Sequence, residues 1–388
     1  MKKITRNIPF GYPLLDDNEK KEIIKVLSGY ILAHGPRTKK FEEEFCKFTR
    51  APYAVSVSSC TSGMHLVYEA LNISKNDEVL VPAQTHVATA HAVEHTGAKP
   101  IFIDCDPATG NIDPNKIEKK ITKKTKAIVV VHFLGLPVDF IEIKKIAKKY
   151  KLKIIEDCAL SLGAKANGIH TGLLGDAGVF SFYPVKHITT GEGGMIITKN
   201  KNLAKKLKIL RALGVDKSFS ERVLPGMYDA KFLGYNYRLS ELQSALGIHQ
   251  IKKINFFLKK RAENFNYLYK NLSKISSLRV LPSSYKSYKG SFYCLSIILN
   301  KELRNKRKLI ITNLNKKGIG TSIYYPQPVP RMTYYKKKYR YLKKDFIHSE
   351  EISDCSICLP VGPHINLEDC KFMLKNINLI LKKIHEKN

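Results

Sequence analysis

Short apolar runs alternate with amphipathic segments along the chain from about residue 53. The runs are rich in Val and Ile, which favour strands, and the segments between them have the periodicity of helices. The predicted strands are Ala54–Val57, Glu78–Pro82, Pro100–Asp104, Ala127–His132, Lys153–Glu156, Gly178–Phe182 and Gly194–Thr198. The predicted helices are Ser62–Leu71, Val87–Gly97, Pro114–Ile121 and Asp139–Tyr150. This order predicts an α/β fold with a mainly parallel, seven-stranded sheet covered by helices on both faces.

The hydrophobic pattern changes in the last third of the chain. A long helical pattern runs from about Ser240 to Leu272 with an interruption near Gly247, and Lys, Asn and Tyr are more frequent beyond it. The elements predicted there are a strand at Phe292–Leu299, a helix at Glu302–Lys317 and a strand at Ile319–Tyr324. We therefore predict a large domain, residues 1–255, followed by a small α+β C-terminal domain, residues 256–388.

Composition limits the class of protein. A chain of 388 residues with 44% hydrophobic residues buries a substantial core, which excludes a wholly disordered protein. Eight cysteines in so long a chain predict no disulfide framework, and they are typical of a reducing compartment. The N-terminal residues lack the apolar core of a signal peptide, and no apolar run approaches the length of a membrane span. We expect a soluble, cytoplasmic protein without a membrane partner.

The chain is strongly basic. Its 66 Lys and Arg residues exceed its 34 Asp and Glu residues by 32. Such an excess is compatible with nucleic acid, a membrane surface or a phosphorylated small molecule, and it does not choose among them. Most of the lysines occur as scattered pairs, such as Lys119-Lys120, which are typical of solvated helix faces.

Polar residues follow three of the predicted strands, at the sheet edge where parallel α/β folds bind ligands. Ser58–Gly63 opens a helix and predicts either an anion site or ordinary N-capping. Asp157 ends an apolar strand, so it needs a cationic or donor partner, or it caps the next helix. Lys186 stands among apolar and aromatic residues, where desolvation lowers the pKa of an amine and makes it a Schiff-base nucleophile; otherwise it is a surface lysine.

Taken together, these three features match the requirements of pyridoxal 5′-phosphate (PLP). That cofactor has a phosphate, an aldehyde that a lysine can hold, and a ring nitrogen that works best against a carboxylate. The motifs SSCTSG, PAQTHVATA, FIDCDPATGNIDP, VVHFLGLPVD, IIEDCALSLGA, GDAGVFSFYPVKHITTGEGG and LGYNYRLSELQSALG occur in this order. In this ordered set the chain resembles the DegT/DnrJ/EryC1/StrS sugar aminotransferases, which are PLP-dependent enzymes of fold type I. The resemblance covers nearly the whole chain.

The resemblance implies a role for eight residues. Lys186 and Asp157 would be catalytic, the first as the Schiff-base lysine and the second as partner of the pyridinium nitrogen. Thr61, Ser62 and Ser181 would hold the phosphate, and His86 stands where the family usually has an aromatic residue over the ring. Asn236 matches an Asn that reaches the phosphate from the neighbouring subunit, which implies a homodimer with shared sites. Arg238 is included among the cofactor-binding residues.

One departure from the family pattern affects the site. The family often has Gln or His at the position of Leu160, near the ring hydroxyl, so that hydrogen bond is missing here unless Ser161 replaces it. A dehydrating subgroup replaces the catalytic lysine with His, whereas here His187 merely follows Lys186. The resemblance thus favours amine transfer from an amino acid, usually glutamate, to a nucleotide-diphosphate-linked keto-deoxysugar. The preferred acceptor is a 4-keto-6-deoxyhexose, as for perosamine-type synthases, with C3 amination or dehydration as the alternative.

Three short motifs permit other interpretations. His91-Ala92-Val93-Glu94-His95 matches the H-x-x-E-H pattern of zinc hydrolases, and Cys355 and Cys358 form a C-x-x-C pair, but neither brings a complete ligand set, so we expect no metal. The stretch Tyr334–Lys344 interleaves basic and aromatic residues as single-strand nucleic-acid binders do. An exposed basic helix or loop with tyrosines packed beneath it is the preferred explanation of that stretch, and we expect no nucleic-acid partner.

Overall fold

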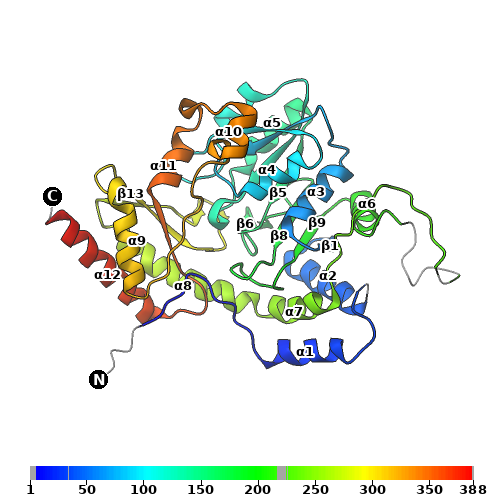
Figure 1. Ribbon diagram of the computed structural model, residues 1–388, viewed down its shortest axis with the longest axis horizontal. Coiled ribbons are helices and arrows are strands. Elements are labelled where there is room, and N and C mark those ends of the chain that lie inside the picture. Colours follow the sequence, from blue (N-terminus) through cyan, green and yellow to red (C-terminus); the bar gives the residue numbers. More distant parts are fainter. Residues whose placement is uncertain (1–5, 34, 216–223, 225, 387–388) are drawn as a thin grey trace.

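The computed structural model describes residues 6–33, 35–215, 224 and 226–386. A large α/β part and a smaller part with the C-terminal elements lie side by side (Figure 1). The large sheet has seven strands in the order β1 (Tyr53–Val57), β9 (Gly194–Thr198), β8 (Ala177–Ser181), β5 (Lys153–Asp157), β4 (Thr125–Val131), β2 (Glu78–Pro82) and β3 (Lys99–Ile103). Only β9 runs antiparallel to its neighbours. The predicted mainly parallel seven-stranded sheet is therefore confirmed.

Helices cover both faces of this sheet. One face packs on α3 (Cys60–Ala70), α4 (Val87–Glu94) and α6 (Lys201–Arg211). The other packs on α2 (Pro36–Thr49), α5 (Phe140–Tyr150) and α7 (Glu241–Lys252), with α1 (Asp17–Leu27) against α7. Side chains of one strand alternate between the two cores, as Ala54 and Val55 do, because successive residues of a strand point to opposite faces.

The smaller part is built on a three-stranded antiparallel sheet. Its order is β10 (Leu278–Val280), β13 (Leu295–Leu299) and β14 (Ser356–Leu359). The helices around it are α8 (Ile254–Leu272), α9 (Arg307–Lys316), α11 (Ile347–Cys355) and α12 (Leu367–His385), and α10 (Thr333–Tyr339) lies against α4. A small four-stranded sheet joins β11 (Ser284–Tyr285) and β12 (Tyr288–Lys289) to β6 (Lys165–Ala166) and β7 (Ile169–His170).

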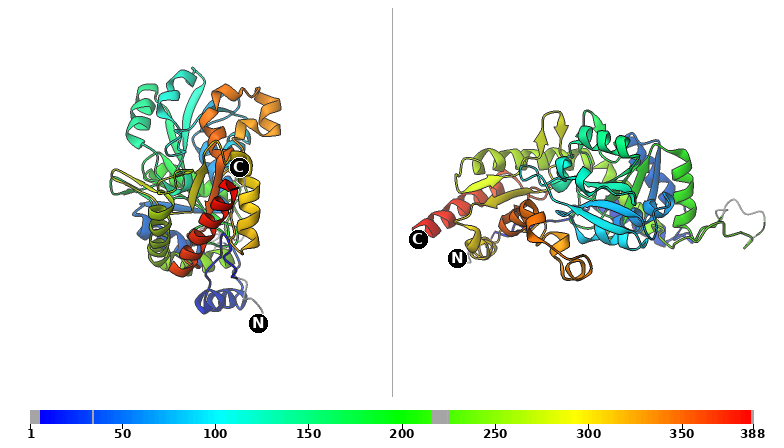
Figure 2. Two further views of the ribbon diagram at one scale, coloured as in Figure 1. Left: turned by 90° about the vertical axis from the view of Figure 1, so that its left-hand side faces the viewer. Right: turned by 90° about the horizontal axis from the view of Figure 1, so that it is seen from above.

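The two parts share one hydrophobic core cluster. Residues of the small sheet pack with Ile8, Phe133 and Leu160 from the first 255 residues. The N-terminal segment also crosses over, because Ile8 exchanges backbone hydrogen bonds with Gly318 and Gly320 at 2.7 and 2.8 Å. The two parts are adjacent in all three views (Figures 1 and 2). The boundary near residue 255 stays a prediction, and the change from α7 to α8 at Lys253 lies next to it.

Three predicted local features are wrong. Pro114–Ile121 is not an α-helix but two 3₁₀ turns, Pro114–Lys116 and Glu118–Lys120, because Ile117 is the only fully buried anchor in this short polar segment. Ile319–Tyr324 forms only isolated bridges, at Ile319 and Ser322, and the third strand of the sheet is the apolar run Ser356–Leu359.

The third correction concerns Gly247, which does not interrupt the helix. α7 runs through it, and the break comes at Lys253. A Cβ at Gly247 would lie 2.6 Å from the Phe41 ring, so this glycine permits the close packing of α2 against α7. No helix in the described part of the chain has the length and apolar character needed to cross a bilayer.

Candidate active site

Three of the polar segments singled out in the sequence meet at one edge of the large sheet. β1, β5 and β8 run in the same direction, so their carboxyl ends lie at the same edge. Asp157 is the last residue of β5, Ser181 is the last of β8, and α3 begins at Cys60, three residues after β1 ends. Cys60 connects these segments, because its Sγ lies 3.6 Å from the Val179 oxygen on β8 and 4.0 Å from Asp157 Oδ1.

The Asp157 carboxylate is buried and held in one orientation. The residue is 6% exposed. Its Oδ2 accepts a hydrogen bond from the Thr89 hydroxyl at 2.8 Å, and its Oδ1 accepts one from the Ala159 N–H at 3.1 Å. Thr89 is in turn bonded to the Thr85 hydroxyl at 2.7 Å. The second contact is a local cap, as the alternative interpretation of Asp157 expected, but no helix follows, and the Thr89 contact holds the carboxylate from across the site.

Lys186 shares this environment with Asp157. Burial lowers the pKa of Lys186 from its ordinary value, and Cys60 and Asp157 act in the opposite direction because negative charge favours the ammonium form. Its amine lies 5.4 Å from the centre of the Tyr293 ring. Burial also raises the pKa of the Cys60 thiol, Asp157 raises it further, and Lys186 opposes both effects. The lysine and the carboxylate therefore both lie close enough to Cys60 to shift the pKa of its thiol.

His86 lies at the entrance to the same site. It caps α4, where its Nδ1 accepts the Ala88 N–H at 3.2 Å, and its ring meets Tyr325 edge to face with centroids 5.7 Å apart. Burial of the ring lowers the pKa of His86; Lys186 lowers it further, and Asp157 raises it. His86 is thus within electrostatic reach of both Lys186 and Asp157, as an aromatic group over a ring bound between them would be.

The hydroxyl groups at the start of α3 divide into two kinds. Ser62 belongs to the capping box of the helix: its hydroxyl donates to the Ser59 carbonyl at 2.9 Å, and its N–H donates to Ser59 Oγ at 3.0 Å. Within the described residues, no hydrogen bond uses the Thr61 hydroxyl. Ser181 Oγ accepts the Tyr183 N–H at 3.4 Å, and Ser181 pairs with Gly194 on β9. Both alternatives for this segment, capping and anion binding, are therefore compatible with the arrangement.

Asn236 and Arg238 are not brought to Lys186 within this chain. Asn236 is exposed and forms a backbone bridge with Ala212, and Arg238 is partly exposed. The residue between them is anchored near β1, because the Tyr237 carbonyl accepts the Ser58 N–H at 2.8 Å. The pair therefore lies on the outer surface beside the start of α3.

The departure at Leu160 is not compensated by Ser161. The Leu160 side chain is buried in the core that the two parts share, and its carbonyl accepts the Ser291 hydroxyl at 2.7 Å. The Ser161 hydroxyl donates to Thr171 Oγ1 at 3.1 Å and is fully buried. Ser161 is thus committed elsewhere.

Sequence reasoning assigned no individual role to three residues of this site: Thr89, Cys60 and Tyr325. Thr89 donates to Asp157, Cys60 lies beside Asp157 within the predicted segment Ser58–Gly63, and Tyr325 meets the His86 ring. For Thr89 a signal existed, because Thr85 and Thr89 are four residues apart and so share one face of a helical turn after β2. Tyr325 meets His86 from more than 200 positions further along the chain, so no local pattern could have indicated this contact.

The alternative zinc motif is engaged by α10. His91 Nδ1 is bonded to the Tyr335 hydroxyl at 2.7 Å, and Glu94 accepts from Tyr339 at 2.5 Å and from Lys338. Tyr335 is 1% exposed and packs beneath this basic stretch, whereas Tyr334 is 50% exposed. Cys355 and Cys358 are buried, free thiols, as are most of the other cysteines.

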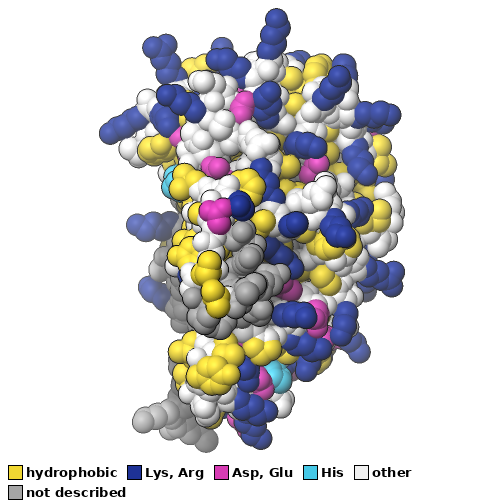
Figure 3. Space-filling model, turned by 90° about the vertical axis from the view of Figure 1, so that its right-hand side faces the viewer, with side chains coloured by type: hydrophobic (Ala, Val, Ile, Leu, Met, Phe, Trp, Pro, Cys, Tyr) yellow, Lys and Arg dark blue, Asp and Glu magenta, His cyan; other side chains and the backbone are white. Residues whose placement is uncertain are grey.

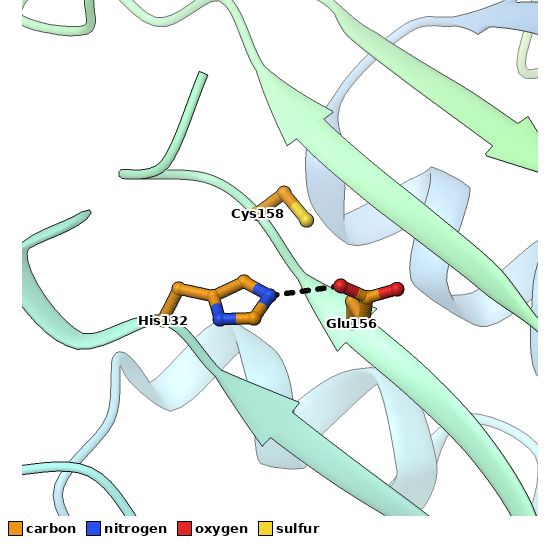
Figure 4. A group of neighbouring side chains, drawn as sticks. All are labelled: His132, Glu156 and Cys158. Carbon is orange, nitrogen blue, oxygen red and sulfur yellow. Dashed lines mark hydrogen bonds and ion pairs between the residues drawn. The ribbon is translucent and has the colours of Figure 1, made fainter. Parts of the chain in front are cut away.

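A buried group outside the site also contains metal-ligating residue types: His132, Glu156 and Cys158 (Figure 4). His132 follows β4 and points at Glu156 on β5, with Nε2 2.9 Å from Oε2. Because His132 Nδ1 accepts the Val138 N–H at 3.2 Å, its proton is on Nε2 and is donated to Glu156. Glu156 also accepts the N–H groups of Gly172, Leu174 and Gly175 at 2.6, 2.8 and 2.7 Å. The His132 nitrogens and the Glu156 oxygens are thus used within the protein.

Known proteins resemble this chain over almost its whole length. It is 35% identical to the UDP-4-amino-4,6-dideoxy-N-acetyl-beta-L-altrosamine transaminase of Campylobacter jejuni over 388 residues, 97% of this chain and 98% of the relative. It is 35% identical to the GDP-perosamine synthase of Escherichia coli O157:H7, with 96% of this chain and 98% of the relative covered.

Solved structures agree with these relatives. The Helicobacter pylori aminotransferase PseC superimposes with a TM-score of 0.91 at 29% identity, covering 97% of this chain and all of that one. A sugar aminotransferase from Streptococcus pneumoniae, described in its PMP form, gives 0.92 at 25% identity over 97% of this chain and all of that one. Residues 13–378 match the description of a single family. The chain belongs to the DegT/DnrJ/EryC1/StrS aminotransferase family, and it is a PLP-dependent transaminase.

Proposed function

We propose that this aminotransferase moves an amino group from glutamate to a nucleotide-diphosphate-linked keto-deoxysugar, at C4 of a 4-keto-6-deoxyhexose, in the biosynthesis of a surface glycan. The observation that carries the proposal is the shared environment of Lys186, Asp157 and Cys60 at the carboxyl ends of the strands. The relatives at 35% identity that are named for 4-amino sugars and perosamine support the choice of acceptor. The excess of 32 positive charges is compatible with a diphosphate substrate.

The residues at this edge fit PLP. The first N–H groups of a helix have no partner inside it, and in α3 those of Ser62 and Gly63 are taken by Ser59. This leaves the N–H groups of Cys60 and Thr61, with the Thr61 hydroxyl, for a phosphate. Gly194, on the neighbouring strand, has no side chain that could block these groups, whereas a Cβ there would lie 2.8 Å from the Cys60 nitrogen. We assign the phosphate to Thr61, Ser62 and Ser181, with Ser62 acting through the helix start, where it completes the capping box with Ser59.

When bound, PLP supplies an aldehyde for a lysine and a ring that takes up the electrons of a bond broken beside the donor nitrogen. Lys186 Nζ would hold that aldehyde. Because burial lowers the pKa of Lys186, the freed amine can accept the donor's Cα proton at Nζ and pass it on, and in the second half-reaction it can deliver a proton to the acceptor carbon. Asp157 would keep a positive charge on the ring nitrogen, and Thr89 orients its carboxylate for this contact. His86 would lie over the ring.

We further propose that the enzyme is a cytoplasmic homodimer with shared sites. The segment that ends with Leu32 and Ala33 lies against the segment that contains Asn236 and Arg238. Ala33 forms a backbone bridge with Ser240, and the Glu241 N–H donates to the Leu32 carbonyl at 2.9 Å. Both expose large hydrophobic side chains, with Tyr30 94% and Leu233 89% exposed. On the face at this end, hydrophobic side chains form several patches, one of them at the lower left, with Lys and Arg between and around them (Figure 3). Such a surface is typical of an interface and supports the homodimer. Eight free thiols are typical of a reducing compartment and support the cytoplasmic location.

Mass analysis of the product tests the substrate assignment. The PLP-loaded enzyme is incubated with glutamate and, in parallel, with a UDP- or GDP-linked 4-keto-6-deoxyhexose or a 3-keto isomer. We expect replacement of the keto oxygen by an amino group in a 4-keto sugar and formation of 2-oxoglutarate. Amination of the 3-keto isomer alone, or loss of water without gain of nitrogen, would establish the C3-aminating or dehydrating alternative instead.

A further inference from the structure

Arg261 is a buried cation without an acidic partner. It lies on α8 and is 6% exposed. In the described part of the chain its guanidinium makes no ion pair and donates one hydrogen bond, from Nη1 to the Tyr293 carbonyl at 2.8 Å. Its Nε is buried and has no partner. Arginine is almost never buried unless it is paired, because an uncompensated charge in the protein interior is costly.

The groups that face Arg261 do not supply the missing negative charge. Its Cζ lies 5.9 Å from the centre of the Tyr293 ring, and Lys186 Nζ lies 5.4 Å from the same ring centre. His187 and His364 donate through Nε2 to the carbonyls of Ser291 and Pro9 at 3.0 and 2.9 Å. Burial and the charge of Arg261 lower the pKa of both imidazoles, so both are neutral. The surroundings of the guanidinium are therefore neutral or positive.

A small cavity opens at this position. Its volume is about 10 Å³, and its walls include Tyr12, Leu14, Pro184, Lys186, His187 and Arg261. This space is small, and a monatomic anion fits it. A water molecule would fit as well, but it would leave the charge of Arg261 uncompensated.

We propose that this cavity binds one chloride-sized anion, which pairs with Arg261 next to Lys186. The anion accepts the hydrogen of Arg261 Nε, the buried donor that lacks a partner. Because it lies beside the amine-bearing residue, it also favours positive charge on the neighbouring groups.

Crystals of the PLP-loaded enzyme grown in bromide test the site directly. We expect an anomalous peak within about 3.5 Å of Arg261 Nε, the range of a hydrogen bond to a large anion. Because the measurement uses the unmodified protein, it does not depend on whether any variant folds. A cavity that holds only water at saturating bromide, or bromide only at surface lysines, would overturn the proposal.

Halide titrations of stability provide the solution test. Gluconate replaces chloride at constant ionic strength, so that general screening of this basic chain cancels. At a chloride concentration ten times its Kd, we expect the unfolding constant to fall about tenfold. Arg261→Met should abolish this response, and it should be relatively more stable in gluconate, where the wild-type charge is unpaired. The matched control Arg304→Met, whose side chain is 46% exposed, should retain the response. An equal response in all three proteins would refute the inference.

Discussion

Replacing Glu156 by Gln should strongly destabilise the large domain, although the change removes no atoms from the core. Glu156 is fully buried beside Asp157 on β5. Its carboxylate accepts four hydrogen bonds, three from the backbone of residues 172–175 and one from His132. It therefore ties β5 to the loop before β8 and to the turn after β4, the elements that fix the position of Asp157.

The cost follows from the positions of the donors. In Glu156→Gln, the remaining carbonyl oxygen can occupy the Oε1 position and still accept from Leu174 and Gly175. The new NH₂ group then faces the Gly172 N–H and the His132 Nε2–H, which are donors themselves. His132 cannot simply move its proton, because its Nδ1 accepts from Val138. Two buried donors lose their acceptor at about 1–3 kcal/mol each, so the expected loss is about 2–6 kcal/mol.

Urea unfolding of the PLP-loaded wild type and variants at one protein concentration measures this loss, as a lower midpoint at unchanged slope. The matched control is Glu142→Gln on α5, where an exposed carboxylate pairs with Lys145 and the change should cost less than about 0.5 kcal/mol. If Glu156→Gln also stayed within about 0.5 kcal/mol, the hydrogen-bond assignment of this group would be wrong.

Three further predictions concern single side chains. Lys186→Ala should lose about 10²–10⁴-fold in turnover and should no longer retain PLP covalently after borohydride reduction, as read by mass. The control Lys199→Ala, at an exposed residue, should keep the turnover and the covalent PLP of the wild type. Thr89→Val removes the 2.8 Å bond to Asp157, so kcat/KM should fall about 10–100-fold, with Thr96→Val, whose hydroxyl bonds a local carbonyl, as the unaffected control. Burial lowers the pKa of His65 from 6.5 to about 4, so the unfolded chain takes up a proton between these values that the folded chain does not. The free energy of unfolding should therefore decrease as the pH is lowered through that range, by up to about 1.4 kcal/mol per pH unit. His65→Gln should flatten this slope in urea titrations.

The hydrophobic pattern of the sequence predicted those helices and strands that neighbouring residues in the chain determine. Six of the seven strands of the large sheet contain at least two Val or Ile residues, and the observed bounds of all seven lie within two residues of the expected ones. Gly247 misled the prediction because its function is packing: it admits the Phe41 ring, a contact between residues more than 200 positions apart. The α2 helix could have been predicted, since Phe41 and Phe45 repeat at helical spacing.

The site divides in the same way. Asp157 ends a strand, Thr61 lies in the first turn of a helix and Lys186 lies in the loop after a strand, and sequence alone shows all three. Tyr325 and Arg261 reach the site from the last third of the chain, and only the fold shows that one contacts His86 and the other lies beside Lys186. Burial without a partner, the property that makes Arg261 informative, cannot be seen in a sequence.

The proposed sharing of sites between subunits leads to a complementation experiment. If Asn236 serves the site of the neighbouring subunit, Lys186→Ala and Asn236→Ala damage different polypeptides of the same site. A mixed dimer would then contain one site with both residues intact and one site with neither. Random exchange at equal concentrations makes half of the dimers mixed, so about one quarter of the wild-type sites would be intact.

The same arithmetic gives the opposite result if Asn236 acts within its own chain. Each site of a mixed dimer would then lack one of the two residues, and mixing would restore nothing. The exposed position of Asn236 favours the first result, because no contact within the described chain brings it to Lys186. Activity is measured before and after subunit exchange in mild denaturant, and Leu233→Lys, which places a charge on the proposed apolar interface, is the control that should prevent both dimerisation and rescue. Recovery of about a quarter of the activity without Leu233→Lys, and none with it, requires that the two subunits build each site together.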